Sequence, residues 1–108
     1  MSAPKKKNYD KLALSFHKKH KGKLKVESKT ELKTKDDWSV VYTPGVAAVS
    51  SYLAKHPKEA YNYTTKGNMV AVVSDGSAVL GLGNIGPLGA LPVMEGKCAI
   101  FKKMAGVD

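Results

Sequence analysis

The chain has no arginine among its 108 residues, and its positive side chains are 18 lysines. Arginine usually provides the bidentate contacts that read guanine, whereas lysine holds a phosphate as a point charge. The missing arginines therefore argue against sequence-specific reading of DNA. The lysines have two open interpretations: they make non-specific contact with a polyanion, or they form a solvated, soluble surface.

Cysteine and long hydrophobic runs are also scarce. The single cysteine, Cys98, cannot form an internal disulfide, and no apolar run approaches the roughly 20 residues of a membrane helix. The N-terminal residues Met-Ser-Ala-Pro-Lys-Lys-Lys hold no apolar stretch of signal-peptide type. We therefore expect a cytoplasmic protein that does not contact a membrane.

The net charge of +9 is unevenly distributed along the chain. Residues 1–35 hold twelve lysines and three acidic residues, whereas residues 36–108 hold six of each. We expect residues 1–7 to form a disordered basic tail and residues 8–108 to form one domain with a modest core. A lysine run of this kind favours a solvated face over a nucleic-acid footprint.

Helical patterns occupy several parts of the chain. Residues 8–21 have amphipathic spacing, with Asn8 as the expected N-cap and Gly22 as the stop. Thr34 to Asp37 is typical of a turn or a helix start. Thr43-Pro44 predicts a helix entrance, and His56-Pro57 predicts its end. A second short helix is expected over residues 57–63.

Other segments have strand-like composition. Residues 23–29 alternate in polarity, residues 69–73 form a continuous apolar run, and residues 77–82 could return as a hairpin partner. The lack of alternation in the second segment predicts a strand buried on both faces. We therefore expect a three-layer α/β/α fold around a small parallel or mixed sheet. Because a new segment begins at Val107, we also expect the chain to be the front piece of something longer.

Lys97 interrupts an apolar helical face. On a helix over residues 86–105, a step of about 100° per residue places Lys97 in the middle of an apolar arc. That arc consists of Ala90, Val93, Met94, Ile100, Phe101 and Met104. Glu95, Lys102 and Lys103 fall on the opposite, polar side. Lysine is seldom buried, so this position suggests either a snorkelling side chain or a desolvated amine that acts as a general base.

Three other motifs are weaker. Gly81-Leu82-Gly83-Asn84-Ile85-Gly86 matches a dinucleotide fingerprint, but its surroundings do not fit a strand–turn–helix unit, and close passage of a substrate fits better. His17 and His20 have a metal-compatible spacing without further ligands, so we expect them to be exposed. Cys98 has no nearby histidine and is expected to pack as a small hydrophobe.

Long stretches of the chain resemble one family. The segments YTPGVA, VAVVSDG, AVLGLGNIGPLGALPVMEGK and FKKMAGVD are similar to the N-terminal domain of short, prokaryotic-type malic enzymes, from about Tyr9 to Asp108. The resemblance implies oxidation of malate by NAD or NADP and decarboxylation to pyruvate and CO2 with Mg or Mn. It also implies a homodimer and an amino-acid-dehydrogenase-like fold.

The same resemblance implies roles for two residues. Lys97, in VMEGK, would be the general base that takes the malate hydroxyl proton, and Tyr42, in YTPG, would be the general acid that protonates C3. The metal would act as a Lewis acid on the substrate oxygens. Residues of the glycine loop would lie near the substrate, namely Leu80, Gly81, Gly83 and Asn84.

The resemblance also predicts what this segment does not contain. Its metal ligands and its dinucleotide-binding domain would follow Asp108, so we expect no cofactor or metal on this segment alone and no activity from it. Asp36, Asp37 and Asp75 are not assigned as ligands. Larger relatives would bind malate through an arginine where this chain has Ala78, so carboxylate recognition stays unassigned. A malolactic reaction, a non-enzymatic basic binding module and a dimerisation module remain alternatives.

Overall fold

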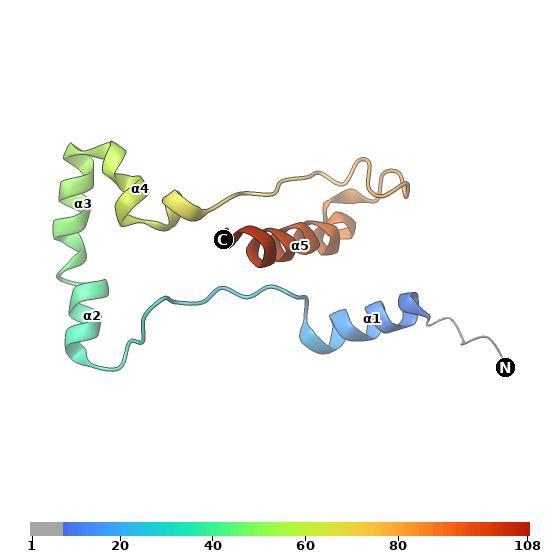
Figure 1. The fold of residues 1–108 in the computed structure, drawn as a ribbon, viewed down its shortest axis with the longest axis horizontal. Coiled ribbons are helices and arrows are strands. Elements are labelled where there is room, and N and C mark those ends of the chain that lie inside the picture. Colours follow the sequence, from blue (N-terminus) through green and yellow to red (C-terminus); the bar gives the residue numbers. More distant parts are fainter. Residues whose placement is uncertain (1–7) are drawn as a thin grey trace. The chain divides into compact units, whose positions relative to one another are not determined.

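A computed structural model describes residues 8–108 of the chain, and its regular elements are all helical (Figure 1). The α-helices are α1 (Tyr9–His20), α2 (Lys35–Val41), α3 (Val46–Lys55), α4 (Ala60–Tyr63) and α5 (Gly86–Ala105). Two 3-10 helices, η1 (Pro57–Glu59) and η2 (Thr65–Asn68), flank α4. Among the described residues, no helix has the length and apolar character needed to cross a membrane.

The expected three-layer α/β/α fold is wrong for this chain, because residues 8–108 contain no strand and no sheet. The segments 23–29, 69–73 and 77–82 follow irregular paths instead. A strand exists only where a neighbour accepts its backbone hydrogen bonds, and apolar composition alone does not supply that neighbour. Two such bonds do form, from Asp108 N to Asn68 O and from Val70 N to Asp108 O, both at 2.9 Å.

The chain divides into two compact units. The first combines the chain up to Lys25 with Val72–Ala105 and therefore contains α1 and α5. The second combines Val26–Ala71 with Gly106–Asp108 and contains α2, α3, α4 and both 3-10 helices.

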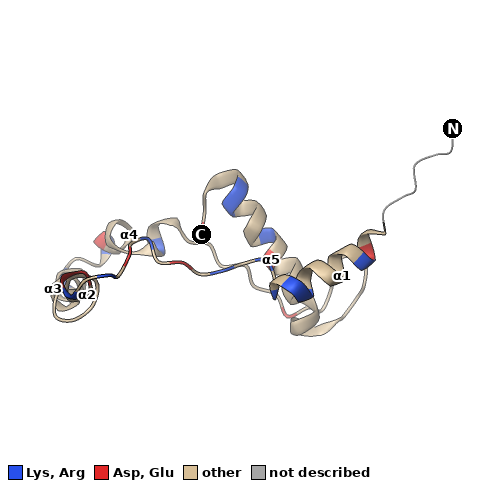
Figure 2. Ribbon diagram, turned by 90° about the horizontal axis from the view of Figure 1, so that it is seen from below, with Lys and Arg blue, Asp and Glu red and all other residues tan. Residues whose placement is uncertain are grey.

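In the first unit, the predicted caps of α1 are confirmed. The Asn8 side chain accepts a hydrogen bond from Lys11 N at 3.1 Å. After His20 the chain turns left-handed, and Gly22 N donates to His17 O at 3.0 Å. Figure 2 shows the lysines of α1 in blue, and two of them, Lys18 and Lys19, lie in its last turn.

In the second unit, a capping box begins α2. Thr34 Oγ1 accepts from Asp37 N at 3.1 Å, and the Asp37 carboxylate accepts from Thr34 N at 2.9 Å. The helix start predicted near Thr34 is therefore confirmed. Gly45 N then donates to Ser39 O at 2.7 Å, and a Cβ at Gly45 would collide with that carbonyl. This close approach explains why the residue before α3 is glycine.

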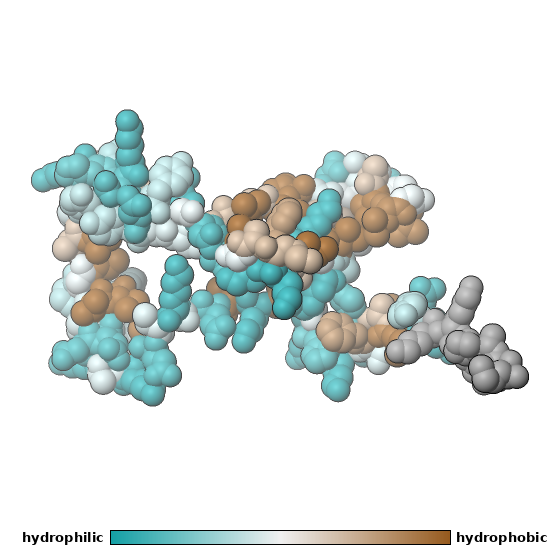
Figure 3. All heavy atoms as spheres, viewed as in Figure 1, coloured by the Kyte–Doolittle hydropathy of each residue, from teal (hydrophilic) through white to brown (hydrophobic). Residues whose placement is uncertain are grey.

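The hydrophobic core is very small. Of the hydrophobic residues in the described range, Val79 and Ala90, both in the first unit, are the two that are buried. Many large apolar side chains remain exposed, and Figure 3 shows them in brown. Since burial of apolar surface is the main stabilising term in folding, each unit holds little of that stabilisation by itself.

Candidate functional site

Lys97 lies on α5, whose bounds match the helix predicted for residues 86–105. Lys97 is exposed, so of the two alternatives the described chain shows a solvent-facing lysine and not a desolvated amine. The reason is that the apolar arc is covered only toward the start of the helix. Ala90 is 1 % exposed, whereas Ile100 and Met104 are 59 % and 81 % exposed. Lys97 therefore lies on an open, largely apolar helix face.

The glycine loop leads directly into α5 in the same unit. Leu80, Gly81 and Gly83 all have positive φ angles, of 46°, 72° and 75°. Asn84 Oδ1 accepts from Gly86 N at 3.3 Å, at the start of the helix. The loop residues that the resemblance places near a substrate thus form a tight, exposed turn on the N-terminal side of the Lys97 helix.

Tyr42 lies in the second unit, at the joint between α2 and α3. Its backbone N–H donates to Trp38 O at 2.8 Å, and its carbonyl accepts from Val46 N at 2.7 Å. The phenol is 66 % exposed. Tyr42 and Lys97 belong to different units, and the structure describes the surroundings of each separately.

Two of the aspartates have structural partners. Thr34 and Lys33 donate backbone hydrogen bonds to Asp37 and lower the pKa of its carboxyl below the usual value. The backbone N–H of Ser77 likewise lowers the pKa of Asp75, with a bond of 2.9 Å. Both carboxylates therefore stabilise turns.

The described chain does not fit a metal ion or a dinucleotide. Across residues 8–108, no three His, Cys, Asp or Glu side chains are grouped in a way that could hold a metal. No strand precedes the glycine loop, so the strand–turn–helix unit of the dinucleotide fingerprint is absent from the described part. The loop is not a nucleotide site of that type.

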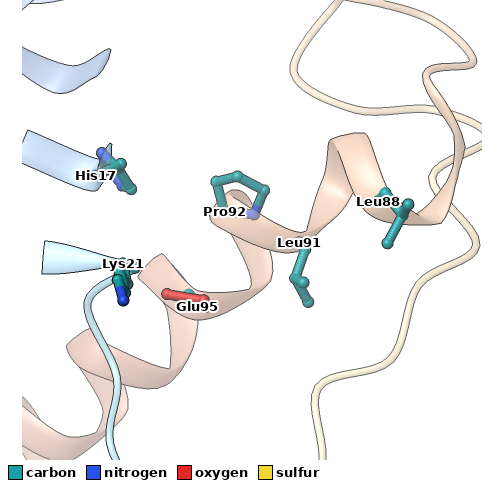
Figure 4. A pocket seen from close by; sticks show the side chains of 7 residues that line it. His17, Lys21, Leu88, Leu91, Pro92 and Glu95 are labelled. Carbon is teal, nitrogen blue, oxygen red and sulfur yellow. The ribbon is translucent and has the colours of Figure 1, made fainter. Parts of the chain in front are cut away.

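A hollow of about 240 Å³ lies between α1 and α5 in the first unit (Figure 4). His17 and Lys21 line it from the α1 side, and Leu91, Pro92 and Glu95 line it from α5. Of the two histidines predicted to be exposed, His20 is exposed and His17 is half-buried.

Two residues that line this hollow, His17 and Glu95, each contact Lys23. Lys23 N donates to Glu95 Oε1 at 2.8 Å, and Lys23 Nζ lies 2.6 Å from His17 Nε2. Glu95 is half-buried rather than fully solvated. Sequence patterns did not reveal this cluster, because the contact of Lys23 with Glu95 joins residues 72 positions apart.

The chain is similar to a family of known proteins. A family model described as "Malic enzyme, N-terminal domain" matches residues 20–108. The chain is 61% identical over 87 residues to an NAD-dependent malic enzyme of Geobacillus stearothermophilus, covering 81% of this chain and 18% of that protein. It is 56% identical over 96 residues to a bifunctional malic/malolactic enzyme of Bacillus subtilis, covering 89% of this chain and 23% of that protein.

Solved structures give the same result. The crystal structure of a malic enzyme from Pyrococcus horikoshii has a TM-score of 0.89 and 51% identity, over 93% of this chain and 24% of that one. An NAD-dependent malic enzyme from Thermotoga maritima has a TM-score of 0.85 and 54% identity, over 89% and 27%. The chain thus spans about a quarter or less of the length of most of these relatives. The match of the family model to residues 20–108 shows that the chain belongs to the malic enzyme N-terminal domain family.

Proposed function

We propose that this chain supplies the proton-transfer residues of a cytoplasmic, homodimeric malic enzyme, which oxidises and decarboxylates malate to pyruvate and CO2. The observation that carries the proposal is the family match over residues 20–108, which includes both the YTPG motif of Tyr42 and the VMEGK motif of Lys97. The relatives are named NAD- or NADP-dependent malic enzymes. Residues 8–108 would be the substrate domain of such an enzyme.

Lys97 acts as the general base in this proposal. It accepts the proton of the malate hydroxyl while the C2 hydride leaves, and this step requires a neutral amine. Covering an amine with apolar surface favours its neutral form. Ile100, Phe101 and Met104 provide such a surface beside Lys97 on α5, and it is open in this chain.

Tyr42 acts as the general acid. After loss of CO2, C3 of the product enolate needs one proton to become the methyl group of pyruvate, and the phenol donates it. An exposed phenol at a helix joint can reach a substrate without displacing core residues. Lys97 then returns a proton to the phenolate in a relay.

In this proposal, the chain itself holds neither the hydride acceptor nor the metal. NAD or NADP would take the hydride, and Mg or Mn would act as a Lewis acid. The described residues offer no site for either, so other parts of the enzyme would hold them. The turn at Leu80, Gly81, Gly83 and Asn84 would lie near the substrate, where its backbone N–H groups can meet a malate carboxylate.

The test uses a full-length enzyme that contains this chain. Pyruvate formation is followed with malate, Mn²⁺ and NAD or NADP for wild type and Lys97→Ala. We expect kcat to fall by about two to four orders of magnitude, because loss of general base catalysis costs roughly 10²–10⁴-fold. Lys103→Ala on the same helix is the matched control and should keep near-normal activity. Activity retained in Lys97→Ala would remove its role as the base.

A malolactic reaction is the second candidate, because a relative that is 56% identical is named a bifunctional malic/malolactic enzyme. In that reaction the pyruvate would be reduced to lactate. The same assay distinguishes the two by measuring lactate and pyruvate together. Lactate that accumulates without net NAD(P)H would favour the malolactic reaction.

A further inference from the structure

A proline interrupts the helix that carries Lys97. α5 is continuous, and Pro92 lies inside it (Figure 4). Proline has no N–H to donate to the carbonyl of Leu88, one turn earlier, and its ring crowds that carbonyl, so a helix bends more easily at such a turn. Pro92 also borders the hollow between α1 and α5, so no side chain packs closely against it on that side. The direction of the residues after Pro92, Lys97 included, therefore needs a second support.

The start of α5 is anchored before the proline. Two backbone N–H groups at the beginning of the helix donate to Gly76 O, at 2.9 and 3.2 Å. Ala90, in the same part of the helix, is buried. These contacts fix the first turns of α5, but Pro92 separates them from Lys97.

Glu95 makes a contact beyond the proline. Its Oε1 accepts a hydrogen bond from Lys23 N at 2.8 Å. The carboxylate lies close against this turn, since a Cβ on Gly22 would be 2.8 Å from Oε1 and 3.0 Å from Oε2. A Cβ on Gly96 would lie 3.6 Å from Lys23 Cε, so the lysine stem runs beside the next residue of the helix. The turn therefore touches the two residues that directly precede Lys97.

The turn is itself well fixed by the end of α1. Lys21 and Gly22 have left-handed backbones, with φ of 54° and 92°, and Gly22 N donates to His17 O at 3.0 Å. Lys23 and Glu95 are both half-buried, so water competes only partly for the bond between them. The capped end of α1 can therefore support the part of α5 that follows the proline.

We propose that Glu95 is a positioning residue for Lys97. By tying the part of α5 after Pro92 to the turn at Lys23, its carboxylate fixes the direction in which the Lys97 amine points. Steps of about 100° per residue put the two side chains on different sides of the helix, so Glu95 acts through the helix and not on the substrate. This inference rests on the proposed role of Lys97 as the general base.

The test measures hydride transfer in a full-length enzyme that contains this chain. Formation of NAD(P)H is followed by stopped-flow absorbance in a single turnover, with saturating malate and Mn²⁺ and with enzyme in saturating excess over NAD(P). We expect Glu95→Ala to lower the rate constant about tenfold to a hundredfold, because a misplacement of about 1 Å can cost ~10²-fold. A merely structural role would lower the amplitude, which follows the amount of folded enzyme, and leave the rate constant unchanged.

Two further variants test the physical reason. Glu95→Gln keeps an oxygen that accepts from Lys23 N and should recover most of the lost rate. Pro92→Ala restores the helix hydrogen bond, so the loss caused by Glu95→Ala should be smaller in that background. Glu31→Ala is the matched control, because it removes an exposed carboxylate that pairs with Lys33 at 2.8 Å. It should keep the wild-type rate constant.

Lys97→Ala, measured in parallel, separates this inference from the proposed function. If Lys97→Ala is inactive while Glu95→Ala keeps the wild-type rate constant, the positioning role is wrong and the role of Lys97 as the base stands. A normal rate constant in Lys97→Ala would overturn both. A loss in Glu95→Ala that is equally large with and without Pro92 would also overturn the inference, since the support would then not act across the proline.

Discussion

Single residues on α5 show how neighbours change the meaning of a pattern. Helical spacing placed Lys97 within an apolar arc and Glu95 on the solvent side. In the structure, Lys97 is exposed and Glu95 is half-buried against the segment after α1. The spacing correctly gives the direction of each side chain around the helix axis. Whether a side chain in that direction is buried depends on which other segment of the chain packs against it.

Gly22 provides a prediction at the residue scale. It has φ +92°, and a Cβ there would meet the Glu95 carboxylate. We expect Gly22→Ala to lower the free energy of unfolding by about 2 kcal/mol, combining left-handed strain with a disturbed hydrogen bond. Urea unfolding followed by circular dichroism measures this loss. Gly81→Ala is the control, because Gly81 has φ +72° with open space around it, and about 1 kcal/mol is expected. Equal losses would contradict the contact with Glu95.

Helix ends are the features of individual elements that local sequence predicts best. Asn8 caps α1 as its residue type indicated, and α2 begins within the predicted turn or helix start at Thr34 to Asp37, because a cap bonds to backbone groups only two or three residues away. The strand-like segments are different. Within residues 69–73, Val70 N donates to Asp108 O rather than to a neighbouring strand, and a sheet does not form in residues 8–108.

The cap of α2 gives a prediction at the element scale. Removing the Thr34 hydroxyl leaves the N–H of Asp37 without its partner in the capping box. We expect Thr34→Ala to cost about 1 kcal/mol of stability, in the range of other N-cap threonines. Thr30→Ala, four residues earlier in an irregular segment, is the control and should change stability little. Thermal unfolding by circular dichroism distinguishes the two, and equal melting temperatures would argue against the capping box.

The same box should be sensitive to acid. Hydrogen bonds from Thr34 and Lys33 lower the pKa of Asp37 in the folded chain below its ordinary value of 3.8. The stabilisation is therefore fully present above that value and is lost as the pH falls through the lower, folded pKa. We expect stability to decrease below about pH 3.8 in the wild type, and the decrease should be smaller in Asp37→Asn. An identical acid response in both proteins would exclude this contribution.

At the scale of the whole molecule, the two units share a shortage of buried apolar surface. Val79 and Ala90 are the buried hydrophobic residues of the described chain, while the face around Lys97 is open. The relatives are several times longer than this chain. An open apolar face around a proposed general base fits a domain whose site is completed by further polypeptide.

This arrangement predicts the behaviour of the chain alone. We expect purified residues 1–108 to form no NAD(P)H from malate and Mn²⁺, because the described residues offer neither a metal cluster nor a dinucleotide unit. Absorbance at 340 nm measures the product, and the full-length enzyme is the positive control. Turnover by the isolated chain at a rate comparable to the full-length enzyme would show that these residues contain a complete active site.

The family, the bounds of α5, the caps of α1 and the approximate start of α2 could be predicted from the amino-acid sequence alone. Motif identity, helical periodicity and capping all act over short distances along the chain, so they can be read without knowing the fold. Three findings came from the folded chain instead: residues 8–108 hold no sheet, Lys97 is exposed, and Lys23 N bonds to Glu95. Each of these depends on contacts between distant segments, and burial and strand pairing are properties of those contacts rather than of any one segment.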